Sequence, residues 1–358
     1  MSVNPASALA LKPLYASLAF AVVLMAVGLL VIGKDLLIPI AIAVLIWYVL
    51  NALAATFGRF RIGGKEAPGW ARMTVAILSV VVAIAAFVEL VNANIDAVTR
   101  AAPTYQANLE RLVADAARRL GFSDVPTFAQ LIEQVDLGGV ASRFASTAAD
   151  LAGSTGLIVI YVVFLLVEQQ SFDKKLAALF PDPEREKRAR KLLHRIQVEI
   201  QTFIWIKTLM AVLTAGVSYA VLAIVGVDFA AFWAVVIFLL NYIPTIGALI
   251  GTVFPTVLAL VQFGTPLPAV IVGGALTAAN VVIGNVLEPR LMGASLNMSA
   301  LVVILSLAIW GTIWGIAGMF LCVPITVVAM IICSHFPASR GVAVLLSADG
   351  KIDTGEDD

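Results

Sequence analysis

Two long apolar runs near the end of the chain, residues 230–263 and 300–333, limit what it can fold into. Each contains 34 residues. A straight α-helix of that length measures about 50 Å, whereas the hydrocarbon core of a bilayer is about 30 Å thick. Each run is also interrupted near its middle by residues that break helices: Pro244 and Gly247 in the first, and Gly311, Gly315 and Gly318 in the second. We therefore expect two broken helices, either as re-entrant hairpins or as full spans.

The rest of the sequence predicts a membrane protein. Hydrophobic residues make up 61% of the chain and charged residues 13%, whereas soluble domains average about 45–50% and 25%. Six further apolar segments are each about long enough to span a bilayer: residues 14–32, 36–57, 73–91, 151–167, 204–225 and 267–287. The fold class is therefore an all-α polytopic integral membrane protein of about eight hydrophobic helical units.

Several classes of function are disfavoured by the composition. The formal net charge is zero, so the sequence shows no basic surface for nucleic acid. Two cysteines, Cys322 and Cys333, lie in apolar sequence, and two histidines, His194 and His335, do not have metal-ligand spacing. The nucleotide-binding P-loop and common hydrolase motifs are missing. We expect no enzyme activity, no cofactor and no bound metal.

The distribution of lysine and arginine predicts the orientation. Basic residues gather at residues 59–72 and 174–195, which should lie in the cytoplasm together with both termini. Acidic residues outnumber the arginines between residues 93 and 150, which suits an extracytoplasmic helical insert. The predicted organisation is as follows: three helices in 1–92, the insert in 93–150, a fourth helix and a basic amphipathic helix in 151–203, a transport core in 204–336 and a short cytoplasmic tail in 337–358.

The basic amphipathic helix should begin at Pro183, with Asp182 as its N-cap. Its apolar and basic residues alternate as far as residue 203, which suits a helix on the anionic membrane surface before the chain turns inward. After it, one ordinary helix and one broken run are followed by another ordinary helix and a second broken run. If both runs are hairpins, the two halves form an inverted repeat, as in transporters with a binding site near the midplane.

Polar residues within the apolar segments are the candidate functional residues. They are Asn241 and Thr245 beside Pro244, Asn280 and Asn285 in the following helix, and Glu288 and Arg290 on either side of Pro289. Glu288 and Arg290 could form a gate pair or a proton-coupling site. Structural roles are the alternative: Asn241 could bond carbonyls freed by Pro244, the other asparagines could join helices, and Glu288 could anchor a helix end. Lys207 could be a snorkelling charge.

Three ordered motifs carry a resemblance to a known family. The first runs from Asn241 to Gly247 and is followed by Pro255. The second runs from Val286 through Glu288, Pro289 and Arg290 to Gly293, and the third from Trp310 to Pro324. Together with Lys207 and Thr208, they resemble the motifs of the autoinducer-2 exporter family of permeases over residues 150–335. Pro255, Pro289, Gly293, Pro324 and Lys207 would be structural positions of these motifs.

The resemblance implies a permease of the bacterial inner membrane, driven by ion or substrate gradients, that forms a homo-oligomer, a pentamer being one option. The leading hypothesis is export of a small polar solute, autoinducer-2 or a related metabolite, through a cavity formed by both breaks. A sodium or lithium/proton antiporter, with Na⁺ or H⁺ as the coupling ion and Glu288 as its titratable group, is the first alternative. A non-transporting scaffold or sensor that uses the insert is the second.

Overall fold

The computed structural model describes residues 17, 21–22, 24–58, 61–62, 65–120, 137–292 and 297–351. Within this part of the chain the protein is almost entirely helical, and six helices are long and apolar enough to cross a membrane, or up to seven if one bent pair counts as a span. The prediction of an all-α polytopic membrane protein is confirmed. Of the first predicted segment, residues 14–32, residues 24–32 are helical, whereas 14–16, 18–20 and 23 lie outside the described residues. The small exception to the helical structure is a two-residue antiparallel pair, β1 (Arg61–Ile62) with β2 (Lys65–Glu66).

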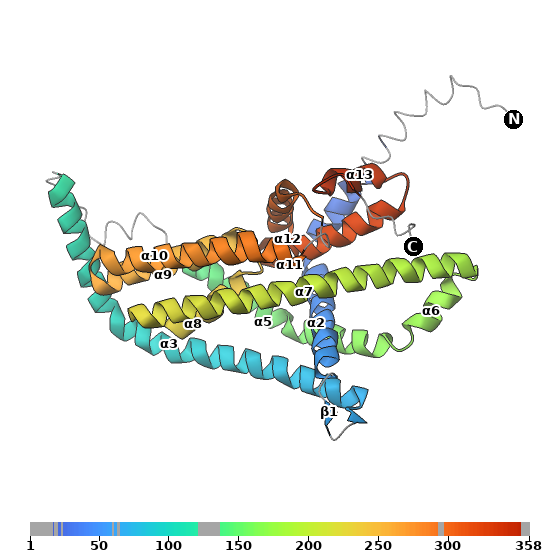
Figure 1. Ribbon diagram of the computed structural model, residues 1–358, viewed down its shortest axis with the longest axis horizontal. Helices are drawn as coiled ribbons and strands as arrows, with labels where there is room; N and C mark the ends of the chain where they lie inside the picture. The colour runs from blue at the N-terminus through green and yellow to red at the C-terminus, as the bar shows by residue number, and fades with distance from the viewer. Residues whose placement is uncertain are drawn as a thin grey trace.

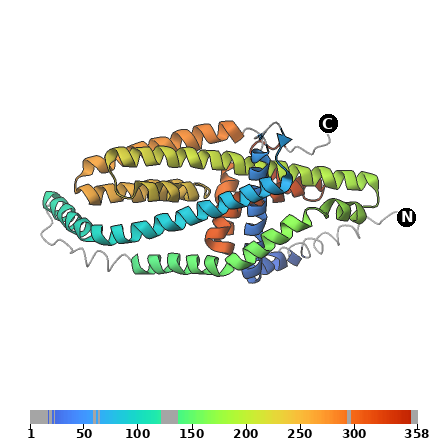
Figure 2. The same ribbon diagram turned by 90° about the horizontal axis from the view of Figure 1, so that it is seen from below.

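The N-terminal helices form one small apolar core. They are α2 (Lys34–Phe57), α3 (Gly69–Leu120) and α5 (Leu137–Glu168). Side chains from all three meet in a cluster: Ala43, Leu50, Ala76, Ile158 and Val162. Figure 1 and Figure 2 show α3 running along the long axis of the molecule while α2 crosses that direction.

Helix α3 is longer than the predicted third span, because its 52 residues continue beyond the apolar stretch Gly69–Asn94. The first part of the predicted helical insert is thus the far part of this same helix, which is described as far as Leu120. This extension, which we call the arm, packs against the C-terminal part of the molecule (Figure 1). The Tyr105 hydroxyl donates to Asp228 at 2.7 Å, and the Asn108 amide donates to the Gln262 carbonyl at 2.9 Å. Residues 121–136 of the predicted insert lie outside the described residues.

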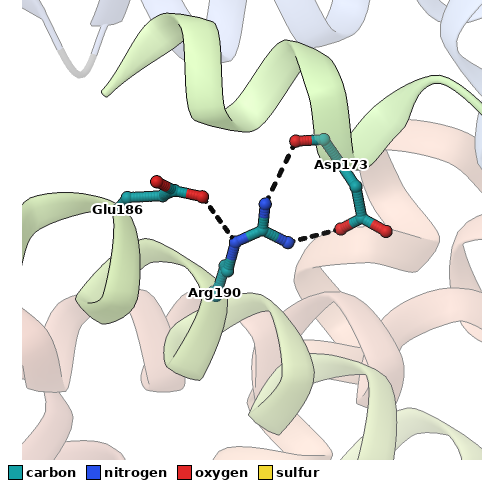
Figure 3. A network of polar contacts seen from close by, with 3 residues as sticks. All are labelled: Asp173, Glu186 and Arg190. Carbon is teal, nitrogen blue, oxygen red and sulfur yellow. Dashed lines mark hydrogen bonds and ion pairs between the residues drawn. The ribbon is translucent and has the colours of Figure 1, made fainter. Parts of the chain in front are cut away.

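An elbow joins α5 to the core through α6 (Phe172–Leu179) and α7 (Pro183–Val225). Arg190 of α7 bonds to both helices. Its guanidinium donates to Glu186 at 2.8 Å and to the side chain and carbonyl of Asp173 at 2.5 and 3.1 Å (Figure 3). Asp173 lies on α6 and Glu186 on α7, so one guanidinium ties the two helices together.

Helix α7 begins as predicted but does not turn. Asp182 accepts a hydrogen bond from the Glu184 amide at 3.0 Å, and Pro183 occupies the first turn. The helix then continues for 43 residues to Val225. The expected turn between a surface helix and a membrane helix near residue 203 is therefore wrong, because no proline or glycine interrupts the sequence from residue 184 to Gly216.

The C-terminal half contains both broken runs. Its elements are α8 (Ala230–Leu240), α9 (Ile246–Phe263), α10 (Pro266–Asn280), the π-helix η1 (Val281–Leu287), α11 (Glu288–Met292), α12 (Ala300–His335) and α13 (Arg340–Leu346). Helices α7, α9 and α10 run along the long axis of the molecule (Figure 1).

Both broken runs fold back on themselves as helical hairpins. In the first, α8 and α9 pack together so closely that the Ile237 side chain lies 3.1 Å from an ideal Cβ at Gly251. In the second, α12 is divided at Gly315, which has φ 62° and ψ −139°. The Thr326 hydroxyl then donates to the Ser306 hydroxyl at 3.0 Å. These two residues would be about 30 Å apart along a straight helix.

Candidate functional site

A cavity of about 600 Å³ lies at the break of the first hairpin. Helices α7, α9, α10, η1 and α11 complete its wall. Six of the predicted site residues line it: Asn241, Pro244, Thr245, Asn280, Asn285 and Glu288. Lys207, Thr214, Thr252 and Thr277 add further polar groups. The structure thus brings most of the predicted polar residues of the core to one place.

The backbone at this break is strained. Thr245 has φ 62° and ψ −52°, and the Ile246 amide donates to the Pro244 carbonyl at 2.6 Å. This is a γ-turn of the rare form with positive φ, which a non-glycine residue adopts at a cost of about 1–3 kcal/mol. Gly247 follows, and an ideal Cβ there would lie 1.8 Å from the Leu240 carbonyl oxygen. The tight turn therefore requires glycine at position 247.

Asn241 carries an oxygen without a partner. Its Oδ1 is buried and accepts no hydrogen bond from any described residue. A buried acceptor left unpaired costs about 1–3 kcal/mol. The structural alternative, a bond to carbonyls freed by Pro244, involves the amide nitrogen of Asn241 and not this oxygen. Asn280, by contrast, donates to the Thr252 hydroxyl at 2.9 Å and so joins α10 to α9, as its structural alternative predicted.

The π-helix η1 presents Asn285 to the cavity, and it was not predicted from the sequence. It ends at Leu287, two residues before Pro289, and Glu288 begins α11. Proline has no amide hydrogen, and its ring collides with the carbonyl four residues earlier. A wider turn relieves both problems, and such π-helical turns occur frequently at functional sites. The one available signal was a proline inside an otherwise continuous apolar helix.

A buried ion pair forms one side of the cavity. Lys207 Nζ lies 2.7 Å from Glu288 Oε1, and the two side chains are 9% and 18% exposed. The predicted pair of Glu288 with Arg290 is therefore wrong, because residues two apart on a helix do not face each other. Arg290 is exposed instead. The idea that Lys207 snorkels is also wrong, since its ammonium is buried against a carboxylate 81 positions away.

The second break has a separate cavity of about 960 Å³. Gly311 and Gly315 line it together with Lys34, Asp35, Ser154, Thr312 and Phe320. The expectation that both breaks form one cavity is corrected: each break has its own. Gly318 lies where the two helices of the second hairpin approach each other closely, and an ideal Cβ there would lie 1.9 Å from the Trp310 carbonyl oxygen.

The remaining motif positions are structural or undescribed. Pro255 is buried within α9 and Pro324 within α12. Gly293 lies outside the described residues.

Polar cavities at broken hairpins in a polytopic α-helical protein are features of the secondary-transporter class. The family model "AI-2E family transporter" matches residues 18–338, and the chain belongs to this family. It is therefore a multi-pass membrane transporter from a family that occurs in bacteria.

Curated relatives align with most of the chain. YhhT of Escherichia coli K12, named as a candidate transport protein, is 31% identical over 318 residues, which is 88% of each chain. TqsA of Escherichia coli K12, named as an AI-2 transport protein, is 28% identical over 319 residues, 88% of this chain and 90% of TqsA. A candidate transport protein of Haemophilus influenzae is 26% identical over 322 residues, 88% of this chain and 91% of the relative.

Proposed function

We propose that this protein is a gradient-driven exporter of a small polar solute, with autoinducer-2 as the first cargo to test, and that the cavity at the first break is its binding site. It would act as a homo-oligomer in the bacterial inner membrane with both termini in the cytoplasm. The observation that carries the proposal is that Asn241, whose buried Oδ1 has no partner among the described residues, is one of the residues that line the cavity. A hydroxylated solute supplies the hydrogen-bond donor that this oxygen lacks.

The other groups of the cavity suit the same class of solute. A volume of about 600 Å³ falls in the usual range for small-molecule sites, about 300–1,000 Å³. Asn285 and Thr277 offer neutral donors and acceptors, while Glu288 and Lys207 already neutralise each other. A neutral, hydroxyl-rich molecule therefore fits better than a highly charged one. The name of TqsA supports autoinducer-2 as the first cargo to test.

The test is efflux of labelled autoinducer-2 from proteoliposomes that contain the purified protein, with and without imposed sodium and proton gradients. Asn241→Leu removes the unpaired oxygen at similar size and should reduce efflux about tenfold, the value of a hydrogen bond in a desolvated site. Asn51→Leu is the matched control, because Asn51 donates to the Trp47 carbonyl within α2 and lines neither cavity. Pro244→Ala should also lose flux, because it changes the turn at the cavity wall.

Equal efflux from the Asn241 and Asn51 variants would remove Asn241 from the site. Absence of efflux under every gradient would reject autoinducer-2 as the cargo and return attention to the scaffold hypothesis.

An antiporter is the second candidate, because Glu288 places a carboxylate in the same cavity. In that case sodium or lithium should move against protons without autoinducer-2, and Glu288→Gln should abolish the exchange. Cation exchange that survives this substitution would exclude Glu288 as the coupling group.

A further inference from the structure

A pair of stacked aromatic rings joins the neighbourhoods of the two cavities. Tyr242 lies between Asn241 and Ile243, which both line the first cavity, and Phe320 lines the second. The rings of Tyr242 and Phe320 are stacked, with centroids 4.9 Å apart and planes 24° apart. The tip of the first hairpin thus contacts the second hairpin through a residue that lines the second cavity.

A hydrogen bond fixes the Tyr242 ring in this position. The Tyr242 hydroxyl lies 2.7 Å from the Thr208 hydroxyl. Thr208 donates its own hydrogen to the Ile204 carbonyl at 2.6 Å, so Tyr242 is the donor to Thr208. Thr208 directly follows Lys207 on α7. The residue that positions the ring is therefore the neighbour of the buried ion pair.

A buried apolar cluster lies next to the rings, and Phe320 packs against it. Ile243 belongs to the same buried cluster as Leu307, Cys322 and Val323 of α12. Charged groups lie in both cavities, Lys207 and Glu288 in one, Lys34 and Asp35 in the other. Two cavities with charged linings on either side of an aromatic and aliphatic layer resemble a polar path that is closed at one point.

We propose that the two cavities are the two ends of one solute path, open toward opposite sides of the membrane, and that the Tyr242–Phe320 pair is its barrier. The second cavity is then a second chamber for the same small hydroxylated solute. The solute passes when the Tyr242 ring leaves Phe320 and its hydroxyl leaves Thr208. This inference rests on the proposed function for its solute, but its test requires none.

The size of the barrier is compatible with opening by thermal motion. One neutral hydrogen bond and one aromatic contact together favour the closed state by about 10- to 100-fold. A minor open state of that population is common in proteins that change conformation.

The experiment measures cysteine accessibility in a background in which Cys322 and Cys333 are replaced by alanine. Ala248→Cys places a thiol in the first cavity and Ala317→Cys one in the second, each in a separate protein. A membrane-impermeant maleimide is added to one side or the other of oriented proteoliposomes. Each thiol should react from one side only, and the two from opposite sides.

Variants of the barrier then test the aromatic pair. Phe320→Ala should make both thiols reactive from both sides, and Tyr242→Phe, which loses only the hydroxyl, should raise labelling from the closed side about fivefold. Phe238→Ala is the control: Phe238 also contacts the Tyr242 ring, with centroids 5.9 Å apart, but lines neither cavity. It should leave the one-sided labelling unchanged.

The proposal is overturned if both thiols react from the same side in the parent protein, or if Phe320→Ala leaves labelling one-sided. Its failure is distinguishable from failure of the proposed function. One-sided labelling that Phe320→Ala abolishes, in a protein that moves no autoinducer-2, would reject the cargo and support the barrier.

Discussion

The two hairpins reach the same shape by different means. In both, a glycine lies against a carbonyl oxygen of the first helix of the hairpin: Gly247 against Leu240, and Gly318 against Trp310. The first reverses through a γ-turn at Thr245 beside a proline, the second through a single residue, Gly315, with positive φ. The close approach is common to the two, and the turn is not.

The chemistry of the two hairpins differs more than their geometry. The first break carries an unpaired buried oxygen and stands beside a buried ion pair. At the second break, the charged residues of the cavity, Lys34 and Asp35, come from α2 and are exposed. The two hairpins therefore share a close approach at a glycine, whereas the unpaired oxygen and the ion pair lie at the first break. The predictions that follow test this separation.

The largest effect is expected at the two close-approach glycines. Gly247→Ala and Gly318→Ala each place a Cβ within 2 Å of a carbonyl oxygen, which should cost about 4 kcal/mol or more of stability. Gly216→Ala, in α7 with nothing within 4 Å of its Cβ, should stabilise by up to about 1 kcal/mol. Thermal unfolding in detergent, followed by circular dichroism, measures all three. If only one hairpin is disrupted, the two do not share this requirement.

The ion pair should distinguish the two cavities. Lys207→Met leaves the Glu288 carboxylate without its partner and should destabilise by about 3 kcal/mol, and adding Glu288→Gln should recover much of that loss. Lys34→Met in the second cavity changes an exposed side chain and should stay within about 0.5 kcal/mol. The same unfolding assay gives the double-mutant cycle. A double variant less stable than Lys207→Met would contradict the pairing.

The second hairpin should depend on one hydrogen bond between its arms. Thr326→Val removes the donor to Ser306 and should cost about 1 kcal/mol. Thr312→Val is the control, because Thr312 is exposed and donates to the Ala308 carbonyl within the same helix of the hairpin. Equal unfolding temperatures for the two variants would mean that the bond contributes nothing to the hairpin.

The attachment of the arm near the first hairpin should weaken at alkaline pH. Burial, with the hydrogen bond to Asp228 as a second cause, raises the pKa of Tyr105 above its ordinary value of 10.0. Because the pKa of Tyr105 is higher in the folded protein, its hydrogen bond stabilises the attachment fully at a pH below 10.0. This stabilisation is lost as the pH rises toward the pKa of the folded state. Hydrogen exchange at residues 100–110 should increase above about pH 10, and Tyr105→Phe should remove that dependence.

The tail beside the second hairpin, residues 347–351, should loosen at acidic rather than alkaline pH, and this is the smallest effect that we expect. The Asn297 amide donates to Asp349 and, with the Lys351 amide, lowers the pKa of that carboxyl below 3.8. The contact of Asp349 therefore stabilises the tail at a pH above the ordinary pKa of the carboxyl group. This stabilisation is lost as the pH falls through the pKa of the folded state. Exchange at residues 347–351 should rise below about pH 4. Asn297→Ala should move this rise to higher pH, and an unchanged profile would exclude the contact.

The sequence predicted the breaks because proline and glycine act locally. Gly315, Pro244 and Gly247 could be placed from the pattern alone, as could the cap at Asp182. The sequence could not show which glycine adopts the positive φ of the turn and which lies against a carbonyl oxygen, because both depend on where the second helix of the hairpin packs. The pairing of Lys207 with Glu288 was missed because it joins distant parts of the chain, and neither segment shows which of its neighbours is close.

The length of α3 was missed for a related reason. The residues after Asn94 were predicted to be helical but were assigned to a separate insert, because they are polar where the preceding span is apolar. The helix nevertheless continues past Asn94, and Tyr105 and Asn108 bond Asp228 and the Gln262 carbonyl. The division into two cavities was also not predictable, because each cavity is lined by segments that are distant in the sequence.

Helix α7 has a mechanical consequence. It runs without a break for 43 residues, about 64 Å, and carries Arg190 near one end and Lys207 and Thr208 near its middle. Arg190, which ties α6 to α7, therefore stands on the same continuous helix as the ion pair and the hydroxyl bonded to Tyr242. We expect a cross-link between α6 and α7 to slow opening of the proposed Tyr242–Phe320 barrier, because a displacement of one end of a continuous helix moves its middle as well.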